Sequence, residues 1–139
     1  MADRRVDRSR EAIKSALISL MKTTPFSKIK ATDVIDASKY CRSTFYKYYC
    51  DIYDLMNKII RDESNHFFEI IAGTIRNERK IEIGEGIYKP AYLLMQHVYE
   101  NQDLYSLLLH NKFPTHNLSV FIQDLSLRFL ETVDIATDY

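Results

Sequence analysis

The sequence feature that most constrains the fold is a long apolar pattern that begins after Asp51. It has helical spacing and consists of Ile52, Leu55, Met56, Ile59, Ile60, Phe67, Phe68, Ile70, Ile71 and Ile75. Side chains that recur every three or four positions lie on one face of a single long helix. Asp51 is the expected N-cap, because its carboxylate can accept hydrogen bonds from the free amides of the first turn. A chain built around this helix is expected to be all-α.

Composition agrees with a helical fold. Only three Gly and three Pro occur among 139 residues, and 46% of the residues are hydrophobic. Such a chain can fill one compact domain, or a small head on a modest second domain. Further helices are expected on both sides of the long one, over residues 7–22, 31–37, 42–48, 88–99, 101–110 and 117–135, with a joint at residues 83–86.

Several classes of protein are not favoured by the sequence. It contains no Gly-rich phosphate loop, no nucleophile elbow and no cluster of metal ligands, so we expect neither enzymatic activity nor a cofactor nor a metal site. Cys41 and Cys50 are expected to be free thiols, and the four histidines are expected at the surface or at helix ends. No apolar run reaches the roughly 18 residues that a membrane span needs, and the first residues do not resemble a signal peptide. We therefore expect a cytoplasmic protein that does not enter membranes.

Charge is distributed unevenly, although the net charge is zero. Residues 1–50 contain eleven Lys and Arg residues against five Asp and Glu residues, whereas residues 51–139 contain eight against fourteen. A basic end on an acidic body suits a protein that meets a polyanion with one end only. An ordinary solvated surface can carry the same excess.

The stretch "SKYCRSTFYKYY" at residues 38–49 concentrates aromatic and basic side chains in the basic half. In a helix that begins near Arg42, Phe45 and Tyr49 share one face and can pack on the core, while Tyr46 and Lys47 point elsewhere. That second face suits phosphate oxygens. The alternative is that the tyrosines are half-buried core residues and Lys47 is an ordinary solvated cation; the sequence does not decide the position of Tyr48.

The wider span "DVIDASKYCRSTFYKYYCDIYDLM", residues 33–56, resembles the DNA-binding head of TetR/AcrR-type transcriptional regulators, in particular their short Phe-Tyr-rich branch. The resemblance covers about residues 7–60. Its matching positions are Asp33, Val34, Thr44, Phe45, Tyr46, Tyr48, Tyr49 and Leu55. It implies an N-terminal helix-turn-helix head over residues 1–50, followed by a small, shortened helical domain for ligand binding and dimerisation over residues 51–139.

The resemblance also implies which residues meet a double-stranded DNA operator. Arg42 and Ser43 are implied at base edges and Tyr46 at a phosphate. The full set of implied DNA-binding residues is Lys30, Thr32, Arg42, Ser43, Thr44, Tyr46 and Lys47. Regulators of this type act as two-fold homodimers whose heads enter successive major grooves.

Three positions depart from the family pattern. Lys39 replaces the glycine of the turn and must adopt a left-handed backbone or reshape the turn. Cys41 replaces the serine that usually caps the recognition helix, so Ser38 or water is expected to serve instead. Ile52 replaces a lysine that often contacts a phosphate.

The C-terminal half suggests a site for a small-molecule effector or a partner protein. An effector site is expected to involve Phe67, Ile71, Tyr92, Met95 and Tyr99, although the same residues suit an ordinary core. Residues 117–135 carry a wide apolar face that suits either a partner surface or core packing; its members are Leu118, Val120, Phe121, Ile122, Leu125, Leu127, Phe129, Leu130 and Val133.

Two functions follow from these observations. The first is a DNA-binding transcriptional regulator whose DNA affinity is controlled at the C-terminal domain. The second is a protein-interaction module or co-activator that keeps the fold, binds DNA weakly and docks a partner through its C-terminal helices.

Overall fold

A computed structural model describes residues 4–77, 88–110, 112–114 and 118–137 of the chain, and within these ranges the regular structure is entirely helical. The all-α prediction is thereby confirmed. The elements are α1 (Arg4–Met21), the 3-10 turn η1 (Phe26–Lys28), α2 (Ala31–Ser38), α3 (Arg42–Tyr48), α4 (Ile52–Asn77), α5 (Tyr88–Glu100), α6 (Gln102–Leu109) and α7 (Leu118–Thr137). The expected joint at residues 83–86 lies outside the described residues.

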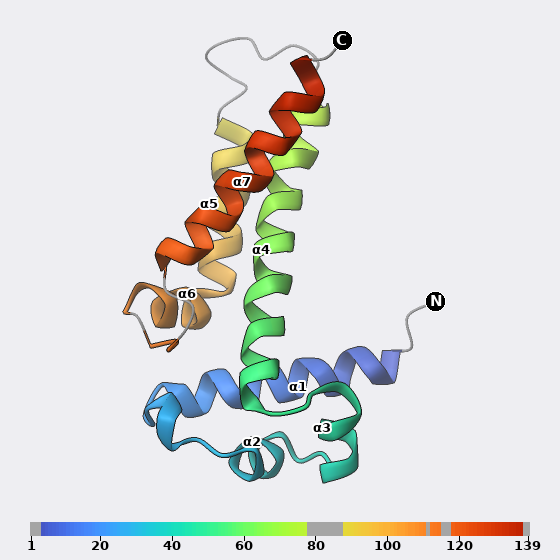
Figure 1. Ribbon diagram of the computed structural model, residues 1–139, viewed down its shortest axis with the longest axis vertical. Helices are drawn as coiled ribbons and strands as arrows, with labels where there is room; N and C mark the ends of the chain where they lie inside the picture. Colours follow the sequence, from blue (N-terminus) through green and yellow to red (C-terminus); the bar gives the residue numbers. More distant parts are fainter. Residues whose placement is uncertain (1–3, 78–87, 111, 115–117, 138–139) are drawn as a thin grey trace.

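The long helix α4 is the axis of the molecule (Figure 1). Helix α1 crosses one end of α4, and the short helices α2 and α3 pack beneath α1. The remaining length of α4 is flanked by α5 and α7, with α6 between them and α1. The segment 38–49 therefore lies at one end of an elongated molecule.

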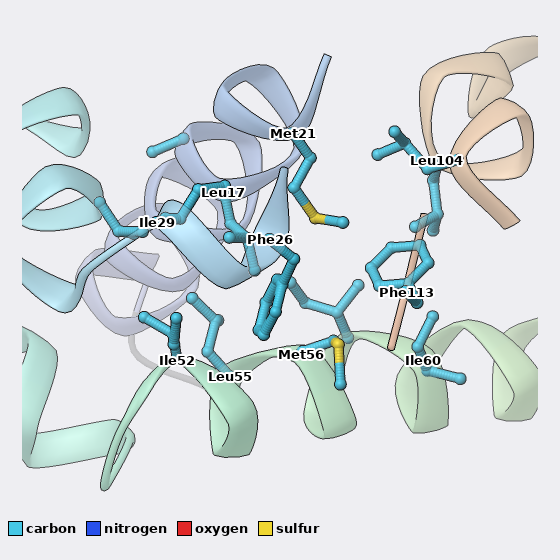
Figure 2. Close-up of a cluster of buried hydrophobic side chains, with 14 of the residues drawn as sticks. Leu17, Met21, Phe26, Ile29, Ile52, Leu55, Met56, Ile60, Leu104 and Phe113 are labelled. Carbon is cyan, nitrogen blue, oxygen red and sulfur yellow. The ribbon is translucent and has the colours of Figure 1, made fainter. Parts of the chain in front are cut away.

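A hydrophobic core joins α1, α4 and α6 (Figure 2). Leu17 and Met21 of α1 meet Leu55 and Met56 of α4, and the core continues to Leu104 of α6. Phe26 and Ile29 fill the space beneath the turn after α1; they are 5% and 4% exposed. The base of the molecule and its upper helices are thus packed into one continuous core.

The start of α4 is fixed by reciprocal capping. The Asp51 carboxylate accepts a hydrogen bond from the Asp54 amide at 2.7 Å, and the Asp54 carboxylate accepts one from the Cys50 amide at 2.9 Å. The expected N-cap is therefore confirmed. The Cys50 amide, followed by the Lys58 ammonium, lowers the pKa of Asp54.

A buried polar cluster joins α4, α5 and α6, and the sequence did not predict it. One oxygen of the Glu63 carboxylate accepts hydrogen bonds from Tyr105 Oη and His97 Nε2, each at 2.5 Å. The three side chains are only 4–8% exposed. His97 lies in the last turn of α5, so the expected position at a helix end is confirmed, but the residue is buried, because helical packing pairs it with a carboxylate 34 residues away. Burial, together with the bond to Glu63, raises the pKa of Tyr105.

Helix α5 presents a different face to the core from the one that its apolar residues suggest. His97 is buried and Val98 packs against the core. Tyr92, Met95 and Tyr99 point outward and are 67%, 72% and 73% exposed. The pairing of His97 with Glu63 is consistent with this orientation of α5, since a buried carboxylate needs hydrogen-bond donors.

Helix α7 has both a packed side and an open side. Phe121 is buried and Leu125 packs against the core, which confirms part of the expected stripe. Ile122, Leu127 and Leu130 are each more than half exposed. The side chain of Val133 lies outside the described part of the chain, as does His116. None of the described helices combines the length with the apolar character that crossing a bilayer requires.

Candidate nucleic-acid interface

Helix α3 is held on the body by its apolar face. Phe45 is completely buried and Tyr49 is 7% exposed, with their ring centroids 5.6 Å apart. Val34 of α2 is also completely buried in the same core. The i, i+4 spacing therefore predicted correctly which side of α3 faces inward. The opposite side is left to solvent.

The turn between α2 and α3 depends on Lys39 and Ser38. Lys39 adopts the left-handed conformation with φ of 61°, and it is the one described non-glycine residue with positive φ. This confirms the consequence expected from replacing the family's glycine. Ser38 Oγ donates to the Ile35 carbonyl at 2.9 Å and accepts from the Tyr40 amide at 3.3 Å, so it stabilises the turn.

The first turn of α3 contains an unusual thiol. Cys41 occupies the N-cap position, and its Sγ lies 3.1 Å from Ser43 Oγ and 3.0 Å from Thr44 Oγ1. These two hydroxyl groups lower the pKa of the exposed Cys41 thiol to about 7. The sequence suggested Ser38 as a substitute cap, but Ser38 hydrogen bonds within the preceding turn instead.

The outward side of α3 presents most of the residues expected at DNA. Arg42, Ser43, Tyr46 and Lys47 are exposed, with Tyr46 at 44%, while Thr44 is partly buried. The Arg42 guanidinium lies 5.4 Å from the centre of the Tyr46 ring, which brings a cation and a phenol together on one surface.

Tyr48, which the sequence left undecided, is partly buried between two cations. The Arg10 guanidinium lies 5.0 Å from its ring centre, and Lys47 Nζ lies 5.5 Å away on the same helix. Tyr48 is therefore part of the packing between α1 and the end of α3.

The other two predicted DNA contacts lie at the start of α2. Lys30 and Thr32 are both exposed. The Lys30 amide donates to the Asp33 carboxylate at 2.8 Å, which fixes the first turn of α2 and leaves the Lys30 side chain toward solvent. Helix α2 packs directly against α3, so these residues belong to the same end of the molecule.

Two exposed residues at this end were not among the predicted contacts. Lys39 projects from the turn itself, and Tyr53 of α4 is 49% exposed, with its ring 5.1 Å from that of Phe26. Ile52, in place of the family's lysine, is 9% exposed and belongs to the core. Tyr53 is the next residue after Ile52. The departure from the TetR/AcrR-type pattern at position 52 is therefore the sequence signal that could have pointed to Tyr53.

The expected effector residues do not line a common pocket in the described structure. Phe67 packs on Phe121 and Tyr105, with ring centroids 5.8 Å and 6.4 Å away, and Ile71 is partly buried. Tyr92, Met95 and Tyr99 lie on the outward side of α5. Phe67 and Ile71 are therefore at least partly buried, whereas the three α5 residues lie at the surface, and the effector site stays a prediction.

A groove lies between α4 and α7. It has a volume of about 450 Å³ and is lined by Asp54, Asn57, Ile60, Arg61, Ser64, Val120, Phe121, Asp124 and Arg128. Two hydrogen bonds join the helices here: Ser64 Oγ of α4 donates to the Asp124 carboxylate of α7, and Arg128 of α7 donates to the Asn65 side-chain oxygen of α4. Within α7, Arg128 Nε also lies 3.1 Å from the Asp124 carboxylate. The groove therefore combines these polar side chains with apolar ones, Ile60, Val120 and Phe121.

Comparison of the chain with models of protein families, with curated proteins and with solved structures finds no match. The described residues contain no group of three potential metal ligands, and both cysteines are exposed free thiols.

Proposed function

We propose that the protein is a cytoplasmic DNA-binding transcriptional regulator of the TetR/AcrR type, in which α2, the turn and α3 act as a helix-turn-helix. The observation that carries this proposal is the two-sided character of α3. Phe45 anchors the helix in the core, while Arg42, Ser43, Tyr46 and Lys47 project together from the opposite side. A short, firmly seated helix with polar and cationic side chains outward is suited to the major groove.

The proposed contacts divide into two kinds. Arg42 and Ser43, in the first turn of α3, are assigned to base edges, because the N-terminal residues of a recognition helix reach furthest into the groove. Tyr46, Lys47, Lys30 and Thr32 are assigned to phosphates, with Thr44 supporting the first turn. Phosphate contacts give affinity and fix the orientation of the helix, whereas base contacts give sequence preference.

The protein is proposed to act as a two-fold homodimer. Exposed apolar side chains on α5 and α7 support this, because surfaces of this kind mark protein contacts. They are Tyr92, Leu93, Met95, Tyr99, Val120, Ile122, Leu127 and Leu130. Two copies joined on this side would offer two α3 helices, whose separation must match the roughly 34–36 Å between successive major grooves.

DNA affinity is proposed to respond to a small-molecule effector or a partner protein at the upper helices. The continuous core supports such a link, because Met21 of α1 and Leu104 of α6 belong to the same hydrophobic cluster. Lys22 of α1 also forms an exposed ion pair of 2.8 Å with Asp103 of α6. A shift of α6 would therefore displace α1 and the helices that pack beneath it.

The same exposed apolar residues favour a second candidate function. A protein-interaction module or co-activator would use α5 and α7 to dock another protein and would bind DNA weakly. The two candidates differ in the role of α3: in the interaction module, substitutions on the outward side of α3 leave activity unchanged.

A mobility-shift titration against the DNA upstream of the protein's own gene tests the proposal. The wild type should shift this DNA at low salt, and Lys47→Ala should weaken binding to all sequences alike and reduce the salt slope by about 1. Lys112→Ala is the matched control, since it removes an exposed cation far along the chain from α3. If the wild type does not shift the DNA even at low salt, DNA binding is refuted and the protein-interaction module is favoured.

A further inference from the structure

A second, smaller groove lies between α1 and α4, away from the outward side of α3. Its volume is about 280 Å³, and it is lined by Arg10, Glu11, Lys14, Tyr49, Lys58, Ile59, Arg61 and Asp62. Four cations therefore face two carboxylates in a space of small-molecule size. The excess of positive charge favours an anion.

The cations of this groove differ in the hydrogen bonds and ion pairs that they already form with the protein. Lys58 donates to the Tyr48 carbonyl at 2.9 Å and to the Asp54 carboxylate at 3.1 Å. Lys14 and Arg61, in contrast, form no ion pair or hydrogen bond with any residue that the structure describes. One comes from α1 and the other from α4, so the groove has an available cation on each side.

Tyr49 provides a hydroxyl group at the same place, because it is among the residues that line the groove. Its side chain is 7% exposed, and its hydroxyl group has no hydrogen-bond partner among the described residues. Burial raises the pKa of Tyr49, with opposing effects from Arg10 and Asp62, two charges of the groove. The phenol therefore stays protonated and can donate. A hydroxyl group that lines a groove and has no protein partner there is available to a ligand or to an ordered water.

We propose that this groove binds a small phosphorylated anion through Arg61, Lys14 and the Tyr49 hydroxyl. The planar guanidinium of Arg61 can donate two parallel hydrogen bonds to phosphate oxygens, and Lys14 supplies a second positive charge from the opposite helix. The Tyr49 hydroxyl donates a third bond from the floor. Arg10 is held beside the groove by its contact with the Tyr48 ring and adds to the positive potential.

Binding of this anion joins α1 to α4. Helix α1 carries α2 and α3 beneath it, so a ligand that bridges the two helices fixes the angle at which the base of the molecule meets the long helix. A ligand that binds only the folded chain also raises its stability by mass action. The site does not depend on the proposed function, because it requires only the packing of α1 on α4.

Isothermal titration calorimetry with inorganic pyrophosphate, at constant ionic strength and without DNA, tests the site. The wild type should bind saturably, with Arg61→Gln about tenfold weaker, as expected for one lost charge-assisted interaction. Tyr49→Phe keeps the buried ring and should bind several-fold more weakly, with an unchanged circular dichroism spectrum. Lys112→Gln, an exposed cation outside the groove, should match the wild type. Heat that does not saturate below about 10 mM, or equal affinity of Arg61→Gln and wild type, would overturn the proposal.

A second measurement separates a small anion from the DNA backbone as the source of phosphate. DNA binding by Lys14→Gln and Arg61→Gln is measured as a function of salt. If both variants reduce the salt slope by about 1 while pyrophosphate fails to bind the wild type, the groove contacts DNA and the proposal is overturned. If pyrophosphate binds and the slopes are unchanged, the small-anion site stands, whether or not the protein regulates transcription.

Discussion

Replacement of Lys39 by glycine should stabilise the protein. Lys39 has φ of 61°, and the left-handed conformation costs an ordinary residue roughly 1–2 kcal/mol. Glycine removes this strain but gains freedom in the unfolded chain, which offsets about 0.4–1 kcal/mol. The net stabilisation should be about 0.5–1 kcal/mol, or about 2–4 °C in Tm for a chain of this length.

Urea denaturation followed by circular dichroism measures this effect in the absence of DNA. The midpoint should rise for Lys39→Gly while the m-value stays constant, because the folded and unfolded surfaces are almost unchanged. Lys47→Gly is the matched control, since Lys47 lies inside α3 and a glycine there should cost about 1 kcal/mol. If Lys39→Gly is neutral or destabilising, the turn before α3 does not have the conformation described here.

Three further predictions address the thiol, the buried cluster and α3. Alkylation of Cys41 by iodoacetamide should accelerate as pH rises, with a midpoint at about pH 7, because the thiolate is the reactive form and the pKa of this thiol is lowered. Mass spectrometry measures the reaction at each cysteine, and an equally fast reaction of Cys50 at pH 7 would contradict this prediction. Tyr105→Phe removes a hydrogen bond to a buried carboxylate and should lower the free energy of unfolding by about 1.5–3 kcal/mol, whereas a loss below about 0.5 kcal/mol in urea titration would refute the bond. Arg42→Ala should reduce discrimination between operator sequences by about 1–3 kcal/mol in competition mobility shifts, while Lys47→Ala weakens all sequences alike; the reverse pattern would exchange their assigned roles.

Much of the framework could be predicted from the sequence because it depends on neighbours along the chain. Helical spacing placed Phe45 inward and α4 in one long helix, and Asp51 caps that helix as its position suggests. The strain at Lys39 followed from one missing glycine. These features are set within a few residues, where local geometry limits the alternatives.

The features that could not be predicted arise from contacts between distant segments. Glu63 and His97 lie 34 residues apart, and the sequence does not reveal that packing buries them as a pair. His97 lies on the buried side of α5, and Tyr92 and Met95 point outward although apolar spacing suggests the core. The groove that holds Arg61 depends in the same way on how α1 crosses α4.

The orientation of α5 also changes how the upper helices are interpreted. Three residues expected at an effector site lie instead on the exposed side of α5, and α7 also exposes apolar side chains. Exposed apolar side chains of this kind favour contact between protein surfaces. Concentration-dependent sedimentation of the wild type and of Met95→Glu distinguishes these uses, since a buried charge in an interface should abolish self-association.

Sequencing of the DNA fragments that the purified protein retains from a random pool tests the central claim most directly. A regulator with α3 as its recognition helix should enrich two related half-sites, arranged as an inverted repeat about one helical turn apart. Arg42→Ala should lose this enrichment while still retaining DNA. Recovery of no enriched sequence by the wild type, or the same enriched sequence by wild type and Arg42→Ala, would contradict the account.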